Sequence, residues 1–339
     1  MADHRPAGHP DVKSGKVGVL LLNLGTPDNT SYGAVRRYLS EFLSDRRVIE
    51  THPAIWQPIL QGVILSTRPQ ASGANYARIW DKVENDSPLR VITRRQAEKL
   101  QARLGDAAIV DYGMRYGNPS TKSRLEALQA QGCEKILLVP LYPQYSATTT
   151  ATANDKAFDA LKTMRWQPAV RTAPAYFEED FYISALAQSI AEGVAALDFE
   201  PQLVLTSYHG MPKKYLLAGD PYHCQCQKTT RLVAEKLGWP REKLMVTFQS
   251  RFGPTEWLKP YTADTLEALP KQGIKNIAIV APAFSTDCIE TLEEISITGR
   301  EQFEHAGGEK YAYIPCLNDS ELGMGMIEAL VRKELSGWI

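Results

Sequence analysis

The sequence predicts an α/β fold made of two similar halves, each with a parallel sheet flanked by helices. Three apolar runs of the first half recur in the same order in the second half, which indicates duplication of one unit. These runs show little alternation of apolar and polar residues, as is typical of strands buried on both faces of a parallel sheet. At 339 residues, the chain is long enough for two domains, each with its own core.

The repeated elements differ at their ends, where the second copy carries ionisable side chains. The paired elements are 22–27 with 207–212, 113–117 with 249–253, and 132–149 with 273–290. In this pairing Leu24 corresponds to His209, and Thr149 corresponds to Glu290. Ligands of open parallel sheets bind beyond the carboxyl ends of the strands. The sequence therefore predicts that the chemistry lies in the second half.

Apolar residues at helical spacing predict the helices that cover the sheets. The expected helices span 31–44, 92–104, 181–197, 228–237, 263–269 and 322–335. No low-complexity linker separates the halves, so we place the boundary near 175–181 and expect the final helix to pack back on the first half. The predicted domains are 16–178 with 322–339 and 179–321, preceded by a disordered tail, 1–15.

Composition excludes several classes of protein. With 38 basic and 39 acidic residues and no basic block, the chain lacks the concentrated positive charge of nucleic-acid-binding proteins. Five cysteines without a hydrophobic leader indicate a reducing compartment, and we expect a cytoplasmic protein. No stretch approaches the about 20 apolar residues that span a bilayer. The expected location is the cytoplasm or the surface of the inner membrane.

The apolar segment 55–65 has no counterpart in the second half. Its apolar side chains would form a broad stripe on a helix that begins near Pro58; they are Ile55, Trp56, Ile59, Leu60, Val63 and Ile64. One interpretation is an ordinary core helix. The other is an exposed lip that covers a flat apolar ligand or contacts a membrane surface.

The segment 281–294 carries the densest functional signal. If a helix begins near Asp287, the carboxylates of Asp287, Glu290 and Glu294 are spaced to lie on one face. Such a ladder could pass a divalent cation inward or carry protons outward. A capping-box arrangement at the helix start explains Asp287 and Glu290 equally well, but it gives Glu294 no role.

His209 is the best candidate for a general base. A histidine after a strand is often only a structural hydrogen-bonding residue. Here Gly210 and Pro212 predict a tight turn, which presents the side chain to a pocket. An imidazole with a pKa of about 6.5 can accept a proton at neutral pH or bind a metal ion.

These motifs together resemble the ferrochelatase family over nearly the whole chain. The matching stretches are 21–27, 112–116, 142–146, 207–212, 219–222, 248–253 and 287–294. The resemblance implies two Rossmann-like halves around a cleft. It also implies insertion of ferrous iron into protoporphyrin IX, with release of two protons, as the last step of haem synthesis.

The resemblance also implies roles for individual residues. His209 matches the catalytic histidine, which either accepts pyrrole protons or first binds iron, and Glu290 matches its partner carboxylate. Asp287 and Glu294 match a polar helix face that guides metal or protons, so that four side chains are candidate metal ligands. The expected porphyrin contacts are Leu24, Arg115, Tyr116, Tyr142 and Trp257, with Arg115 pairing with a propionate.

The chain departs from some relatives at its cysteines. Cys288 stands where many relatives have histidine, and Ala147 stands where some carry a cysteine that holds a [2Fe-2S] cluster. We therefore expect no cluster and no other resident cofactor, and we interpret Cys224 and Cys226 as an ordinary reduced pair. No obligate protein partner is inferred. The alternatives are a chelatase for another tetrapyrrole, with coproporphyrin and iron or with cobalt, and a non-enzymatic metal or tetrapyrrole carrier.

Overall fold

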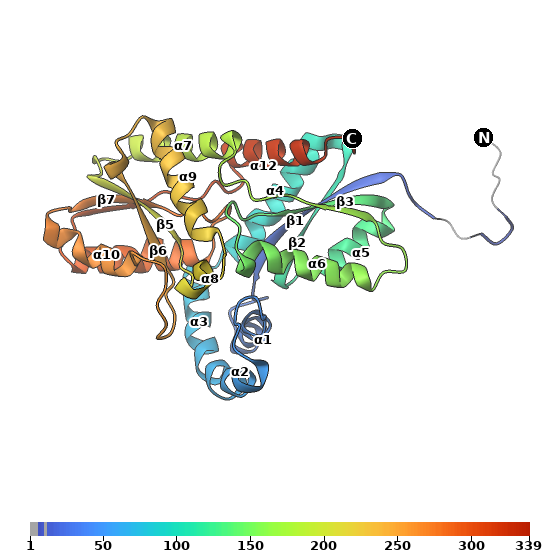
Figure 1. Ribbon diagram of the computed structural model, residues 1–339, viewed down its shortest axis with the longest axis horizontal. Coiled ribbons are helices and arrows are strands. Elements are labelled where there is room, and N and C mark those ends of the chain that lie inside the picture. Colours follow the sequence, from blue (N-terminus) through green and yellow to red (C-terminus); the bar gives the residue numbers. More distant parts are fainter. Residues whose placement is uncertain (1–5, 10–11) are drawn as a thin grey trace.

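Two four-stranded parallel sheets form the centre of the protein (Figure 1). This computed structural model describes residues 6–9 and 12–339, so that part of the predicted disordered tail, 1–15, lies outside the described residues. The strand orders are β2-β1-β3-β4 and β6-β5-β7-β8, which is the same order in both halves. The strands are β1 (Lys16–Thr26), β2 (Ile109–Gly117), β3 (Cys133–Pro140), β4 (Ala169–Thr172), β5 (Leu203–His209), β6 (Leu244–Gln249), β7 (Asn276–Val280) and β8 (Lys310–Tyr313).

Helices cover both faces of each sheet, with α4, α7, α9 and α12 on one side and α5, α6 and α10 on the other (Figure 1). Each helix expected from the periodicity is present, with its ends shifted by a few residues. The α-helices outside 53–79 are α1 (Tyr32–Leu43), α4 (Pro88–Leu104), α5 (Thr121–Ala130), α6 (Thr152–Lys162), α7 (Asp180–Ala195), α8 (Lys213–Leu217), α9 (Tyr222–Leu237), α10 (Thr262–Ala268), α11 (Arg300–His305) and α12 (Glu321–Glu334). Short 3-10 turns are η2 (Gly105–Ala107), η4 (Arg241–Lys243) and η5 (Pro270–Gln272).

The register of the sheets confirms two of the three predicted correspondences. Leu21 pairs with Val139 in the first sheet as Thr206 pairs with Val280 in the second, as expected if Leu24 matches His209. The third repeat also ends alike in both halves, in the π-helices η3 (Ala147–Ala151) and η6 (Glu290–Gly299). Thr149 and Glu290 lie in these two π-helices.

The second correspondence is wrong by two residues. Asn23 pairs with Met114 and Tyr208 pairs with Phe248, so Met114 is equivalent to Phe248 and not to Ser250. The backbone agrees, because Met114 N–H donates to Pro119 at 2.8 Å and Phe248 N–H donates to Pro260 at 2.8 Å. The predicted match was based on the Arg-aromatic-Gly sequence that both halves contain. In the second half these residues, 251–253, lie beyond the last paired residue of β6, Gln249, so they are not equivalent to residues 115–117 of β2.

Two equivalent glycines let the strand ends approach each other. A Cβ on Gly25, whose φ is +110°, would lie 1.8 Å from the carbonyl oxygen of Tyr116. A Cβ on Gly210 would lie 2.5 Å from the carbonyl oxygen of Gln249. Both glycines directly follow the residues expected to face the ligand, Leu24 and His209. The close packing of backbone at this position is therefore common to both copies.

The halves share one hydrophobic core on the side of α4, α7, α9 and α12. It contains Leu21 and Val139 of the first sheet together with Val204 and Val280 of the second. On the opposite side each half has its own core, around Leu20 in the first half and in the second around β7 and the helices α10 and α11. Helix α12 contacts α4 and β3 of the first half and α7 of the second. The domain limits 16–178 with 322–339 and 179–321 stay a prediction.

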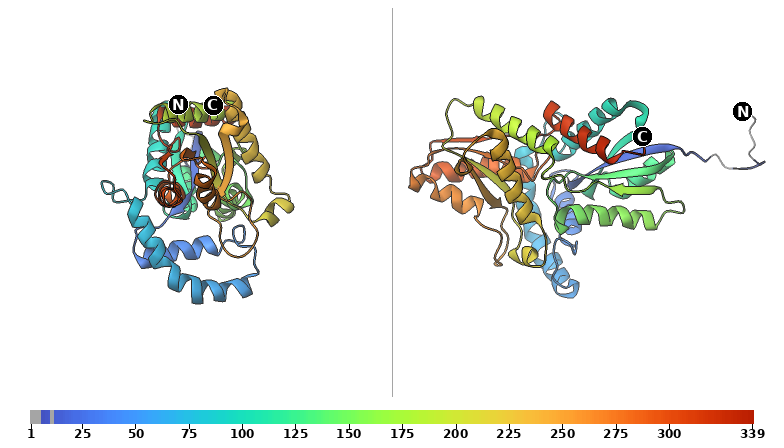
Figure 2. Two further views of the ribbon diagram at one scale, coloured as in Figure 1. Left: turned by 90° about the vertical axis from the view of Figure 1, so that its left-hand side faces the viewer. Right: turned by 45° about the horizontal axis from the view of Figure 1, so that its top comes forward.

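A continuous helical stretch, residues 53–79, replaces the predicted helix 55–65, and we call it the lip helix. It consists of α2 (Pro53–Ile59), the π-helix η1 (Leu60–Ile64) and α3 (Leu65–Ile79). It begins at Pro53 instead of Pro58, and it bends where Pro58 and the π-turn interrupt regular α-helical bonding. With α1 it projects from one side of the body, next to α8 (Figures 1 and 2).

The lip helix has one buried side, as expected of a core helix, and one exposed apolar side, as expected of a lip. Leu60 is fully buried against Leu43 and Leu65, and the Trp56 indole donates to the Leu43 carbonyl at 2.7 Å. Ile55 and Val63 are 61% and 60% exposed, and Ile59 lies between them and is also exposed. The side chains open to a ligand or membrane are thus Ile55, Ile59 and Val63. Leu60, Trp56 and the half-buried Ile64 instead fix the helix to α1.

The two sides should respond differently to truncation. Leu60→Ala should lower the free energy of unfolding by ~2–5 kcal/mol, because it removes buried contacts and leaves a cavity. Ile59→Ala, a matched exposed change one residue away, should stay within about 0.5 kcal/mol of the wild type. Chemical denaturation of both variants measures the difference. Equal losses of stability would contradict the assignment of the two sides.

Candidate active site

His209 ends β5 and stands at the rim of the second sheet, as predicted. Its Nδ1 lies 2.7 Å from the carbonyl oxygen of Gly210. Because a carbonyl only accepts, Nδ1 must carry the proton, and the lone pair of a neutral imidazole then resides on Nε2. Trp257 packs over the Gly210 turn, where a Cβ would come within 3.1 Å of its indole, and the Phe284 ring lies 6.5 Å from the imidazole. His209 is therefore half-buried among aromatic rings, with one basic nitrogen.

Glu290 and Glu294 lie four residues apart in the π-helix η6. The side-chain amide of Gln249, at the end of β6, donates to the Glu290 carbonyl at 2.7 Å and fixes the start of this helix. The Ser250 N–H donates to the Glu294 carboxylate at 2.6 Å, and the Ser250 hydroxyl donates to its second oxygen. Ser250 has a φ of +62°. A residue in this left-handed conformation turns both of its donors toward one carboxylate.

Burial raises the pKa of Glu294 above its ordinary value, and the nearby Glu290 carboxylate raises it further. The hydrogen bonds from Ser250 and the charge of His209 oppose this shift without cancelling it. His209 and Glu290 both act on the Glu294 carboxyl through their charges. His209 at the end of β5 and the two carboxyl groups of η6 are therefore the candidate set of proton acceptors in the second half.

Asp287 does not belong to this set, and the prediction of a three-carboxylate ladder is wrong. The helical stretch begins after Asp287, and the Asp287 side chain is buried in the protein. It accepts hydrogen bonds from Thr291 at 2.9 Å, Tyr313 at 2.5 Å and Asn318 at 2.6 Å. The alternative, that Asp287 caps the N-terminus of the helix, is also wrong. A cap would accept from a backbone N–H in the first turn of the helix. Among the described residues, the Asp287 carboxylate instead accepts from side chains and from the N–H of Cys316, which is distant in sequence. Asp287 anchors the loop before η6.

The first half supplies apolar and hydroxyl groups. Leu24, at the end of β1, packs with Tyr38, Tyr76 and Tyr116 in a cluster that Ile289 of the second half joins. Tyr142 is half-buried, and its hydroxyl is shielded from solvent with no hydrogen-bond partner in the structure. Burial raises the pKa of Tyr142, as does the charge of Glu290 to a smaller extent. The Trp257 indole N–H is likewise unpartnered. Both groups could bond a ligand between the halves.

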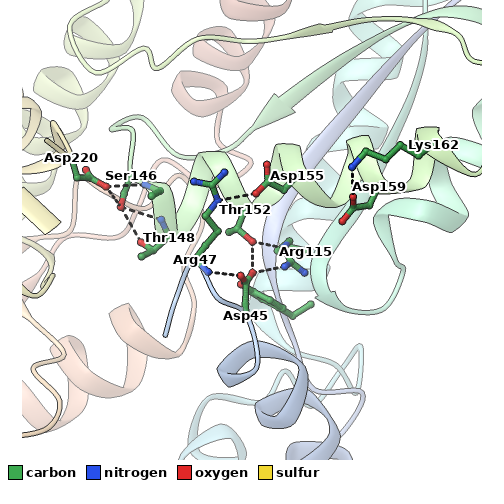
Figure 3. A network of polar contacts seen from close by, with 12 residues as sticks. Asp45, Arg47, Arg115, Ser146, Thr148, Thr152, Asp155, Asp159, Lys162 and Asp220 are labelled. Atoms are coloured by element: carbon green, nitrogen blue, oxygen red, sulfur yellow. Dashed lines mark hydrogen bonds and ion pairs between the residues drawn. The ribbon is translucent and has the colours of Figure 1, made fainter. Parts of the chain in front are cut away.

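Arg115 and Tyr116 both bond to Asp45, and Figure 3 shows Arg115 beside Asp45 and Thr152. Arg115 also lines a surface pocket together with Arg36, Arg37 and Lys156. The Arg115 guanidinium pairs with Asp45 and donates from Nε to Thr152 at 2.6 Å. The Tyr116 hydroxyl donates to the same Asp45 oxygen at 2.7 Å, and Tyr116 is fully buried. Asp45 occupies one side of the Arg115 guanidinium, and the pairing of Arg115 with a substrate propionate stays a prediction.

The cysteines form no part of the proton-accepting set. Burial raises the pKa of Cys288 well above its ordinary value, and the neighbouring Glu290 adds to the shift, so this thiol stays protonated. Cys226 is buried and Cys224 is exposed, and both thiols are free. Within the described residues, no three His, Cys, Asp or Glu side chains are grouped so that they could hold a metal ion. The metal role predicted for His209, Glu290, Asp287 and Glu294 stays a prediction.

Several residues of the site were not predicted from the sequence. Ser250 lies in a motif that was noticed, but its φ and its contact with Glu294 carry no sequence signal. Phe284 follows β7 as His209 follows β5, so its position at a strand end could have pointed to it. Arg68 of the lip helix stacks on Phe252 of the second half, with its guanidinium carbon 4.2 Å from the ring centroid. This exposed arginine spans from the lip helix to the second half.

The fold and the site define a chelatase-like protein of two halves. SirB from Bacillus subtilis with Fe3+ superposes with a TM-score of 0.54 at 12% identity, over 94% of this chain and 95% of that one. The sirohydrochlorin chelatase SirB from Bacillus subtilis subspecies spizizenii in complex with cobalt superposes with a TM-score of 0.56 at 9% identity, over the same shares. At these identities the likeness shows a shared fold.

The sequence relatives define the family. A family model described as ferrochelatase matches residues 16–335. The ferrochelatase of Allorhizobium ampelinum is 61% identical over 100% of this chain and 99% of its own length. That of Mesorhizobium japonicum is 62% identical over 98% of this chain and 95% of its own. The chain belongs to the ferrochelatase family. Among the described residues, no helix has the length and apolar character needed to cross a membrane.

The Asp45 network should make stability depend on pH in a defined direction. Burial raises the pKa of Asp45, but hydrogen bonds from Thr152, Arg47 and Tyr116 and the charge of Arg115 outweigh it, so the net pKa is lowered. A carboxyl with a lowered pKa stabilises the fold above its unfolded value of about 3.9, and this contribution is lost as the pH falls through the folded value.

We therefore expect Asp45→Asn to be less stable than the wild type by about 1–3 kcal/mol at pH 7. The gap should shrink as the pH falls below about 4. Denaturant unfolding at pH 7 and pH 3 measures it, with Asp159→Asn as control, because Asp159 pairs with Lys162 on the surface. A gap that is constant or grows in acid would rule out the charged network.

Proposed function

We propose that this chain inserts ferrous iron into protoporphyrin IX, with His209 and Glu290 as the groups that receive the pyrrole protons. Membership of the ferrochelatase family makes the chain an enzyme that inserts a metal ion into a porphyrin. The observation that supports the residue roles most strongly is the link between the two elements that carry them: His209 pairs with Gln249 in the sheet, and the Gln249 amide donates to the Glu290 carbonyl at 2.7 Å.

The reaction exchanges one ferrous ion for two protons on the pyrrole nitrogens, so the site must accept two protons. The unprotonated Nε2 of His209 can take one of them. A carboxylate of η6 can take the other: Glu290 is one candidate, and Glu294 is the second, because a raised pKa makes a carboxyl group a better base. Imidazole and carboxylate groups also suit transient contact with Fe2+, whereas the protonated thiol of Cys288 does not.

Apolar contacts support the binding of a flat macrocycle between the halves. Leu24 and Tyr142 of the first half and Trp257 of the second are the candidate walls. Binding energy from these faces can offset the cost of bending the ring toward the entering ion. For a propionate, Arg68 is a second candidate beside Arg115. Arg68 stacks on Phe252 and is exposed, while Arg115 pairs with Asp45 and lines a surface pocket.

The alternative substrate is coproporphyrin, because none of the proposed contact residues distinguishes a porphyrin with two propionates from one with four. Zinc-insertion assays with protoporphyrin and coproporphyrin side by side, read by product absorbance, distinguish the two. A higher kcat/KM with protoporphyrin is expected. A clear preference for coproporphyrin, or for cobalt over iron, would replace the proposed substrate while keeping the enzyme class. Iron enters this proposal as a substrate, and the proposal includes no resident cofactor or [2Fe-2S] cluster.

We further propose that the enzyme works in the cytoplasm at the surface of the inner membrane. The support is the exposed row of Ile55, Ile59 and Val63 along the lip helix. Such a row can enter the headgroup region of a bilayer or cover an apolar substrate that leaves it. No protein partner is proposed.

His209→Ala should abolish metal insertion, because the only proposed imidazole base is lost. We expect kcat to fall at least about 100-fold, the typical contribution of a positioned acid or base. Porphyrin binding, followed by the shift of the absorption band, should stay near the wild-type value. His223→Ala is the control, since His223 stacks on Phe248 away from the proposed base. Near-normal turnover of His209→Ala would remove His209 from the mechanism.

Glu290→Gln should lower kcat in the same way while the protein stays folded. The substitution keeps the size of the side chain, and the Gln249 contact goes to the backbone carbonyl, which is unchanged. Circular dichroism and a thermal melt check folding beside the kinetic assay. Loss of the folded state without a specific loss of rate would show that Glu290 serves the helix start and not the reaction.

The exposed row of the lip helix should affect membrane contact and not stability. Ile55→Ser with Ile59→Ser should weaken liposome cosedimentation and raise the KM for protoporphyrin, because exposed apolar area is lost. The melting temperature should stay near that of the wild type, since neither side chain is buried. A large fall in melting temperature with unchanged KM would show that these residues serve only packing.

A further inference from the structure

The chain that forms the lip is fastened at both of its ends. At its entrance, Asp45 pairs with Arg115 and accepts from Thr152 in the first half. At its exit, the Arg78 guanidinium donates to Glu293 at 2.6 Å and to Glu301 at 2.9 Å in the second half. Residues 46–77, between these two anchors, therefore run from the first half to the second.

The two anchors use equivalent positions of the duplicated unit. Thr149 of the first half corresponds to Glu290 of the second, so Thr152, three residues later, corresponds to Glu293. Thr152 holds the start of the lip, and Glu293 holds its end. One position in each copy thus receives one end of the inserted segment.

The exit anchor joins the lip to the helix that carries the candidate acid groups. Glu293 lies in η6 between Glu290 and Glu294, and its side chain is only 9% exposed. It also accepts from Thr298 at 3.0 Å in the same helical stretch. Two residues before Arg78, Tyr76 packs in the Leu24 cluster that Ile289 joins. Helix α3 therefore contacts η6 through both an ion pair and apolar packing.

We propose that Arg78 is a positioning residue that couples the seating of the lip helix to the placement of Glu290 and Glu294. A lip that lies over the cleft and a π-helix that presents its carboxylates inward form one state, joined by the Arg78–Glu293 pair. A porphyrin that enters or leaves past the lip then also loosens the carboxylate helix. The kinetic part of this inference rests on the proposed function, whereas the coupling itself does not.

Arg78 has two partners, and they make a matched comparison. The Glu293 partner is nearly buried, and the Glu301 partner is 54% exposed. Exposed pairs contribute little, so the nearly buried Glu293 is the partner expected to hold Arg78 in place. Conversely, Arg78→Gln would leave the nearly buried Glu293 charge without its cation. Glu293→Gln should therefore release the lip, and Glu301→Gln should not, although both changes remove one carboxylate from the same guanidinium.

Hydrogen exchange of the resting full-length protein, read by mass spectrometry, tests the coupling without metal or porphyrin. We expect Arg78→Gln and Glu293→Gln to raise exchange together in α3 and η6, by about fivefold or more. Glu301→Gln and the surface control Arg94→Gln should leave both segments unchanged. An increase confined to one of the two segments, or one of equal size in Glu301→Gln, would overturn the proposal.

Steady-state kinetics with protoporphyrin test the consequence for the reaction. Arg78→Gln and Glu293→Gln should each raise KM and lower kcat, as changes at a closing element do. The double variant should be no worse than either single variant, since both act through one pair. Arg78→Lys should recover part of both constants. Additive effects, or a lowered melting temperature with unchanged KM and kcat, would contradict the assigned role. An inactive wild type that still shows the coupled exchange would instead count against the proposed reaction alone.

Discussion

The hydrogen bonds that fasten residues 144–147 of the first half to the second half determine how the two sheets face each other. Asp220 accepts from the Ser146 hydroxyl at 3.0 Å and from the Ala147 N–H at 2.8 Å, at the start of the π-helix η3 (Figure 3). The Gln225 amide oxygen accepts from the Tyr145 N–H at 2.6 Å, and the Gln144 amide donates to Thr229 at 3.1 Å. These bonds join the segment after β3 to the segment that begins α9. With the shared core, they fix the segment that follows β3 against the second half.

The duplication explains why only one half carries the chemistry. Both copies build the same frame, with glycines at Gly25 and Gly210 and a π-helix after the third strand. In that frame the first copy places Leu24 where the second places His209. A flat apolar substrate that takes up an ion at its centre needs an apolar surface to bind its face and, on the other side, groups that accept its protons. Substitutions at equivalent positions of the two halves supply the apolar surface and the proton acceptors, while the backbone fold of each half stays the same.

Much of this arrangement can be predicted from the sequence, because strand ends leave a local signal. Apolar runs that stop at a glycine or at a polar residue identify β1, β5 and β7, and through them Leu24, His209 and Glu290. The resemblance to the ferrochelatase family rests on the same motifs, and the family model and the relatives confirm it. The covering helices follow from their periodicity, with errors of a few residues at their ends.

What the sequence does not predict depends on contacts between distant residues. By its spacing, Asp287 is expected to lie on one helix face with Glu290 and Glu294. In the structure its carboxylate instead accepts hydrogen bonds from Tyr313 and Asn318. Arg115 looks like a free cation until Asp45, 70 positions away, pairs with it. The lip helix reads equally as core or as surface, because Leu60 and Ile59 are both apolar and only their neighbours decide which is buried. Arg78 and Glu293 carry no motif, and their pairing follows only from the way the lip helix crosses to the second half.

The central claim is that the porphyrin lies between the halves, with its ring nitrogens facing the second. A crystal structure of the protein with bound metal-free protoporphyrin tests it directly. The account predicts the macrocycle between Leu24 and Tyr142 on one side and Trp257 on the other, with pyrrole nitrogens nearest to His209 and Glu290. A porphyrin bound outside this cleft, or one whose nitrogens face the first half, would contradict the account.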